Sequence, residues 1–143
     1  MIPKGTAYKT TTVSRFKNKA NVEEYLNKFN IKDILWKESD PKESYLIFKK
    51  VDENNNNAYY KIEIPFIQKD VKGVLEFHEE RAYAYLWHIF KAMMNQTDIG
   101  MAIEEVFLPN LVIDKAPDGH PITVKDKANE LRAKNGLPQL ELR

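Results

Sequence analysis

The segment "HEERAYAYLWHIFKAMMNQ", residues 78–96, constrains the fold of this chain more than any other. Apolar residues recur at helical spacing from Val74 to about Gln96, and they fall into two adjacent stripes. An apolar arc this wide predicts a helix that is covered on more than one side, by a sheet and by another helix or a second subunit. We expect the centre of the core to consist of Leu86, Trp87, Ile89 and Phe90.

Three segments before this helix have strand character: "DILWK" (33–37), "SYLIFKK" (44–50) and "AYYKIEIPF" (58–66). The linkers between them, "ESDPKE" and "DENNNN", are rich in turn-forming residues, so an antiparallel meander is expected. The last strand alternates, which indicates one buried face and one face that is at least partly exposed. The face expected to be buried carries Tyr60, Ile62, Ile64 and Phe66.

The two ends of the chain complete the prediction. "KTTTV" (9–13) is β-branched and predicts a short strand or part of an extended basic arm over residues 1–13, after which Ser14 would cap a helix over 14–29. Asn30 is expected to end that helix in a left-handed conformation. After the long helix the patterns predict a short helix, a hairpin over 110–124, and a last helix that begins at Thr123 and stops at Asn135-Gly136.

These elements predict one α+β domain over residues 1–143. It would hold a three-stranded antiparallel meander, extended to four strands if residues 9–13 pair with it. Helices 14–29 and 74–96 would pack on one face, followed by the C-terminal hairpin and helix and a tail over 137–143. No internal repeat and no interdomain linker is evident.

Composition excludes several classes. The chain has no cysteine, so disulfides, zinc ribbons and thiol catalysis are excluded. No apolar run approaches the roughly 20 residues that span a bilayer. The first residues lack the apolar region of a secretory signal. A cytoplasmic protein with no membrane association is therefore expected, in the host cytoplasm if the protein is viral.

Charge is unevenly distributed although the net charge is only +1. Residues 1–50 hold 11 Lys+Arg and 6 Asp+Glu, a net +5, whereas residues 51–109 hold 5 and 10, a net −5. A basic N-terminal region can bind nucleic acid, with exposed aromatics on a sheet stacking the bases. The residues expected to do so are Lys9, Arg15, Lys17, Lys19, Tyr59 and Lys61.

Catalytic motifs are not evident. His78 and His88 are ten positions apart, so they cannot hold one metal ion from the same helix face. No serine lies in a G-x-S-x-G motif, and the five glycines are isolated. The "DGHP" segment (118–121) reads first as a turn. We therefore predict no catalytic residue, no metal ligand and no cofactor. A small hydrolase or nuclease is a distant alternative, because it needs two carboxylates and a histidine meeting in a cleft.

Several segments, taken in order along the chain, resemble a family of small uncharacterised proteins of phages and integrated mobile elements. The resemblance spans about residues 14–140 and rests on "VEEYLNKFNIKDI", "RAYAYLWHIFKAMMN", "IGMAIEEVFLPNLVI", "DGHPITV" and "NGLPQL". Within these segments, Trp87, Lys91 and Ala92 match the family's long-helix pattern, whereas His88 stands where the family commonly has Arg. The resemblance implies an accessory protein of a mobile element and carries over no catalytic residue.

Three functions follow as hypotheses. The first is a non-enzymatic accessory protein that binds another protein or itself, with Tyr83, Trp87 and Met94 of the wide apolar arc as partner-binding residues. The second is a nucleic-acid-binding accessory protein that uses the basic set named above. The third is the small hydrolase or nuclease.

Overall fold

The computed structural model describes the backbone of residues 4–142 and the side chains of residues 15–142. Its first half contains α1 (Lys4–Lys28), β1 (Ile34–Lys37), β2 (Tyr45–Val51), β3 (Asn57–Glu63), β4 (Gln68–Val71) and β5 (Val74–Phe77). Its second half contains α2 (Glu79–Met94), α3 (Ile103–Val106), β6 (Val112–Lys115), β7 (Pro121–Thr123) and α4 (Val124–Ala133). The predicted α+β class is confirmed.

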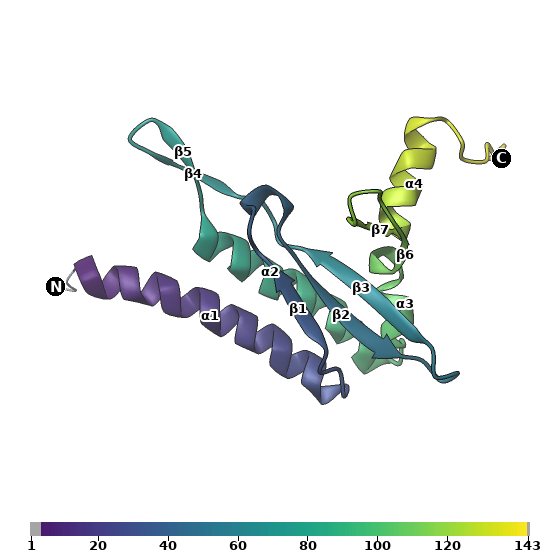
Figure 1. Ribbon diagram of the computed structural model, residues 1–143, viewed down its shortest axis with the longest axis horizontal. Coiled ribbons are helices and arrows are strands. Elements are labelled where there is room, and N and C mark those ends of the chain that lie inside the picture. Colours follow the sequence, from purple (N-terminus) through teal and green to yellow (C-terminus); the bar gives the residue numbers. More distant parts are fainter. Residues whose placement is uncertain (1–3, 143) are drawn as a thin grey trace.

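The predicted meander is confirmed as a three-stranded antiparallel sheet in the order β1-β2-β3. Helices α1 and α2 run beside each other on one face of this sheet (Figure 1). The buried face predicted for β3 is also confirmed, since Tyr60, Ile62 and Ile64 are buried. On the other face Lys61 is buried as well, so the burial does not alternate along the whole strand. Phe66 lies beyond the strand and is 39% exposed, so the predicted buried face ends at Ile64 and does not include Phe66.

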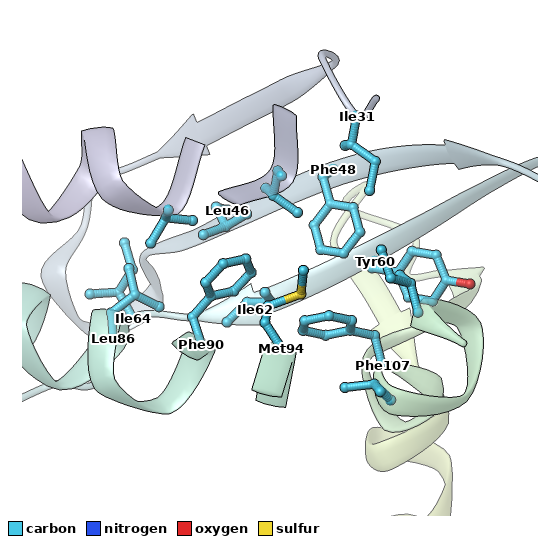
Figure 2. Close-up of a cluster of buried hydrophobic side chains, with 14 of the residues drawn as sticks. Ile31, Leu46, Phe48, Tyr60, Ile62, Ile64, Leu86, Phe90, Met94 and Phe107 are labelled. Carbon is cyan, nitrogen blue, oxygen red and sulfur yellow. The ribbon is translucent and has the colours of Figure 1, made fainter. Parts of the chain in front are cut away.

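The core lies between the sheet and the two helices (Figure 2). Leu86 and Phe90 are 1% and 0% exposed, so half of the predicted core of α2 is confirmed. Trp87 is half-buried, and Ile89 is 48% exposed. The ring of Phe107, which follows α3, lies 5.9 Å from that of Phe90 and closes the core from the C-terminal side.

The predicted start of the long helix is wrong. Residues 74–77 form β5, and α2 begins at Glu79 with His78 as its N-cap. The two residues between β4 and β5, Lys72 and Gly73, have φ angles of 54° and 83°, which are the left-handed values of a tight hairpin turn. Because of that turn, residues 74–77 pair with β4, and the helix begins only after them.

The predicted strand or extended arm over residues 9–13 is also wrong. These residues belong to α1, which begins at Lys4, so no fourth strand joins the meander and Ser14 is not a helix cap. A β-branched run disfavours a helix only weakly, and extending an existing helix by further turns requires no new nucleation step. The other end of α1 is as predicted, because Asn30 has a φ of 63° and follows the last helical turn.

The C-terminal unit, β6 through α4, lies beside β3 (Figure 1). The predicted hairpin and last helix are confirmed. Thr123 caps α4 through a reciprocal pair of hydrogen bonds with Asp126, and Asn135 is left-handed after the helix. A single bridge joins Tyr60 to Leu111, which ties this unit to the edge of the sheet. The C-terminal unit covers the outer face of β3 at Lys61, whereas Tyr59 and Glu63 on the same face are exposed, as predicted.

Candidate functional site

Glu38, one residue after β1, forms ion pairs with two of the basic residues predicted to bind nucleic acid. Lys19 Nζ lies 2.6 Å from one carboxylate oxygen of Glu38, and Arg15 Nη2 lies 3.4 Å from the other. The hydroxyl of Tyr83 on α2 also donates to Glu38. Arg15 makes a second ion pair with Glu79, at 2.6 Å. Both cations therefore connect α1 to the end of β1, Arg15 also connects it to α2, and their charges are largely neutralised there.

The Glu38 network shifts the titration of its members. Burial would raise the pKa of Glu38, but the hydrogen bonds from Lys19 and Tyr83 and the nearby cationic charge outweigh it, so the pKa lies below the ordinary carboxylate value. Burial first, and then the hydrogen bond to Glu38, raise the pKa of Tyr83 well above that of free tyrosine. These shifts are those of a structural ion network that is partly screened from solvent.

The other predicted nucleic-acid residues do not converge on one surface. Lys17 is exposed on α1, and the side chain of Lys9 lies outside the described residues. Tyr59 is 45% exposed on the outer face of β3, where it lines a shallow hollow of about 450 Å³ with Leu35, Ile47 and Lys49. Lys49 Nζ lies 3.1 Å from Asp33, so a carboxylate already neutralises the cation nearest to Tyr59.

Lys61 is the largest departure from expectation among the predicted residues. Its side chain is only 5% exposed, because the C-terminal unit covers the outer face of β3 at this position. Its ammonium lies 3.2 Å from His120 Nε2 and 4.8 Å from the centre of the Tyr45 ring. The hairpin residue His120 thus reaches a lysine 59 positions earlier in the chain, a contact that no local sequence pattern signals.

A cleft of about 430 Å³ opens at this point. We call it the Lys61 cleft. Its lining includes the polar or charged residues Lys42, Tyr45, Lys61, His120 and Lys125 and the apolar residues Phe66, Ile89 and Met93. Two carboxylates, Glu43 and Glu63, also line it. The sequence pattern predicted an exposed sheet face at Lys61 and a turn at His120. It therefore did not predict the cleft.

The predicted partner-binding residues are mainly part of the core. Tyr83 and Met94 are 3% and 1% exposed, and neither presents a surface to another chain. Trp87 is half-buried, with its ring 5.5 Å from that of Tyr25 on α1. The second apolar stripe of α2 is therefore covered by α1 within the same molecule, which is one of the two coverings that the wide arc allowed.

Another exposed apolar feature is the hairpin β4–β5, which extends away from the rest of the molecule (Figure 1). All of β4 and all of β5 except Phe77 are exposed, and Val74 and Leu75 are 61% and 63% exposed. Phe66 and Phe77 stack with their ring centroids 5.8 Å apart and hold the base of the hairpin. The helical pattern predicted residues 74–77 as the start of the long helix, although "DVKGVL" contains the two-residue turn that indicates a hairpin.

Among residues whose side chains are described, no three His, Asp or Glu side chains are arranged to hold a metal ion. None of the helices with described residues is long and apolar enough to cross a bilayer.

Comparison of the chain with protein-family models, with curated proteins and with solved structures finds no match. The resemblance to mobile-element proteins therefore stays a prediction.

Proposed function

We propose that this protein is a non-enzymatic accessory protein that acts by binding another protein chain, and that hairpin β4–β5 makes the contact. The observation that supports the proposal is the exposure of both strands of this hairpin along their whole length, apart from Phe77. The resemblance to proteins of phages and mobile elements supports an accessory role, with a viral or host protein as partner.

The physical argument begins with the stability of the hairpin. A two-stranded hairpin is marginally stable in water unless a third strand or a helix covers it. Here Val71 pairs with Val74 beside the turn, and Leu75 pairs with Asp70. Burying one exposed Val or Leu side chain stabilises a complex by about 1.5–3 kcal/mol. A partner that covers these side chains would therefore stabilise the hairpin and be bound by it.

The edges of the hairpin indicate how a partner binds. Strand β4 pairs with β5 on one side, and within the described residues neither strand belongs to a larger sheet. Each hairpin edge thus offers backbone N–H and C=O groups to an incoming strand. The partner is expected to contribute an extended segment with apolar side chains at alternate positions.

The test compares the double variant Val74→Thr, Leu75→Thr with the wild type. Threonine keeps the strand preference and removes the apolar contact surface. The control is Val51→Thr, because Val51 is also exposed, at 46%, but lies at the end of β2. Light scattering over a concentration series measures self-association, and affinity capture from host extract measures other partners. We expect the double variant to lose a specific partner that wild type and control both retain. A monomeric wild type whose captured proteins equal those of the double variant would refute the proposal.

Nucleic-acid binding is the second candidate, and the exposed ring of Tyr59 is the observation that favours it. Fluorescence anisotropy with labelled single-stranded DNA, duplex DNA and RNA over a salt series tests it. Phosphate neutralisation would give saturable binding with a steep dependence on salt, weakened in Tyr59→Ala. Absence of binding at low salt would remove this candidate.

A further inference from the structure

The Lys61 cleft contains a buried cation with little negative charge around it. Lys61 is 5% exposed, and burying a charged group is costly unless another charge compensates it. The nearest carboxylate oxygen, on Glu63, is 3.9 Å from the ammonium, beyond hydrogen-bond distance, and the Glu63 side chain is 62% exposed. That carboxylate is therefore hydrated and compensates Lys61 only weakly.

The hydrogen-bond partner of Lys61 is the His120 ring. An ammonium group has three donors and no acceptor, so in this contact a charged Lys61 donates from Nζ and His120 Nε2 accepts. The Tyr45 ring adds a cation–π contact on another side. Among the described residues, no other hydrogen-bond acceptor for this ammonium is found, which leaves two of its donors for a ligand in the cleft.

The position of His120 is itself held by the fold. Its backbone N–H donates to Asp118 Oδ1 at 2.9 Å, inside the turn that joins β6 to β7. Its ring contacts the Tyr45 ring edge-on, with centroids 5.8 Å apart. On the other side of Lys61, the backbone carbonyl of that residue accepts from Asn110 Nδ2 at 2.9 Å. The contacts around the Lys61 ammonium are therefore already formed in the absence of a ligand.

The rest of the lining is mixed. Lys42 and Lys125 add positive charge to the cleft, and Glu43 and Glu63 offset part of it. The apolar lining includes Phe66 and Ile89, which are still 39% and 48% exposed. A volume of about 430 Å³ is within the range of small-molecule sites. This combination suits a small ligand with one anionic end and one apolar end.

We propose that the Lys61 cleft binds a small amphipathic ligand whose carboxylate or phosphate group pairs with Lys61 and whose apolar part lies against Ile89 and Phe66. The site shares Phe66 with the base of hairpin β4–β5, but its proposal does not depend on the protein-binding proposal. Charge-assisted hydrogen bonds from a poorly solvated ammonium are stronger than those from a surface lysine, so the anionic end should supply most of the selectivity.

The experiment is NMR titration of the full chain with four probes, followed through backbone amides and the His120 ring protons. Hexanoate and hexyl phosphate carry both ends of the expected ligand, hexanol carries only the apolar end, and inorganic phosphate only the anionic end. We expect at least one of the two amphipathic anions to bind about tenfold tighter than hexanol and than inorganic phosphate, with shifts centred on Lys61 and His120. Comparison of hexanoate with hexyl phosphate then identifies the anionic group.

Two variants complete the test. Lys61→Met should reduce the affinity for the preferred anion to that for hexanol, whereas Lys49→Met, on the outer face of β2, should leave it unchanged. If Lys61→Met does not fold, Lys42→Met and Lys125→Met, both at exposed positions, should each weaken the anion and spare hexanol. The proposal is overturned if no probe shifts the cleft signals up to its solubility limit. It is also overturned if the anions bind no better than hexanol, or if neutralising these lysines changes nothing.

Discussion

Removal of the Glu38 carboxylate should destabilise the fold more than removal of an ordinary surface carboxylate. Glu38 accepts from Lys19, Arg15 and Tyr83, so one side chain joins α1, the end of β1 and α2. In Glu38→Ala two cations lose a nearby counter-charge, and the Tyr83 hydroxyl loses its acceptor in a position where the residue is 3% exposed.

The magnitude follows from how far this network is shielded from water. The side chains of Glu38 and Lys19 are 20% and 18% exposed, and that of Arg15 is 30% exposed. An exposed ion pair contributes about 0.2–1 kcal/mol, and breaking a buried pair costs about 3–5 kcal/mol. A network of intermediate exposure with three donors should fall between these limits. We expect Glu38→Ala to lower the free energy of unfolding by about 2–3 kcal/mol, and Glu38→Gln by less, since the amide oxygen still accepts from one donor.

Urea denaturation followed by tryptophan fluorescence and by circular dichroism measures this difference. The control is Glu130→Gln, because Glu130 pairs with Lys134 at 2.8 Å across one turn of α4, with both side chains well exposed. This control should unfold close to the wild type. If Glu38→Ala unfolds within about 0.5 kcal/mol of the wild type, the network is no stronger than a surface pair and the reasoning fails.

Three further predictions concern pH, the core and the last helix. Because the folded state lowers the pKa of Glu38, its stabilisation is fully present above the ordinary carboxylate pKa of about 4.3 and is lost as pH falls through the lowered folded-state pKa. Thermal melts between neutral and acid pH should thus show a smaller acid loss in Glu38→Gln, and equal losses would contradict the assignment. Phe90→Ala should cost roughly 3–5 kcal/mol in urea unfolding, because Phe90 is fully buried, whereas Ile89→Ala should have a small effect; similar costs would show that α2 is oriented differently. Thr123→Ala should cost about 1–2 kcal/mol through loss of the α4 cap, and Thr123→Ser should restore most of it; an unchanged midpoint in the alanine variant would show that the cap is dispensable.

Local pattern was sufficient where one physical preference dominated. The alternation through Tyr60, Ile62 and Ile64 required one buried face, and the structure buries it. Thr123 with Asp126 three residues later is a capping signal that depends only on neighbouring residues. Pattern was insufficient at residues 74–77, where apolar residues fit either a strand or the first turn of a helix. There the two-residue turn at Lys72 and Gly73 was decisive.

The candidate sites were less predictable than the fold. Arg15 and Lys19 look like free cations in the sequence, and only the packing of α1 beside β1 brings Glu38 to them. Lys61 looks like an exposed strand residue, and only the return of the C-terminal unit buries it beside His120. The exposed hairpin β4–β5 was hidden because its apolar residues continue the periodicity of the following helix.

Local sequence was enough to predict the α+β class, the three-stranded meander, the inward face of β3 and the caps that end α1 and begin α4. Each of these depends on residues close together in the chain, whose spacing and backbone preferences act before any tertiary contact forms. The tertiary structure alone decided which face of α2 meets α1, which lysines are neutralised or buried, and where a cleft opens. Those outcomes depend on contacts between segments far apart in the chain, such as that of Lys61 with His120, and no local periodicity encodes them.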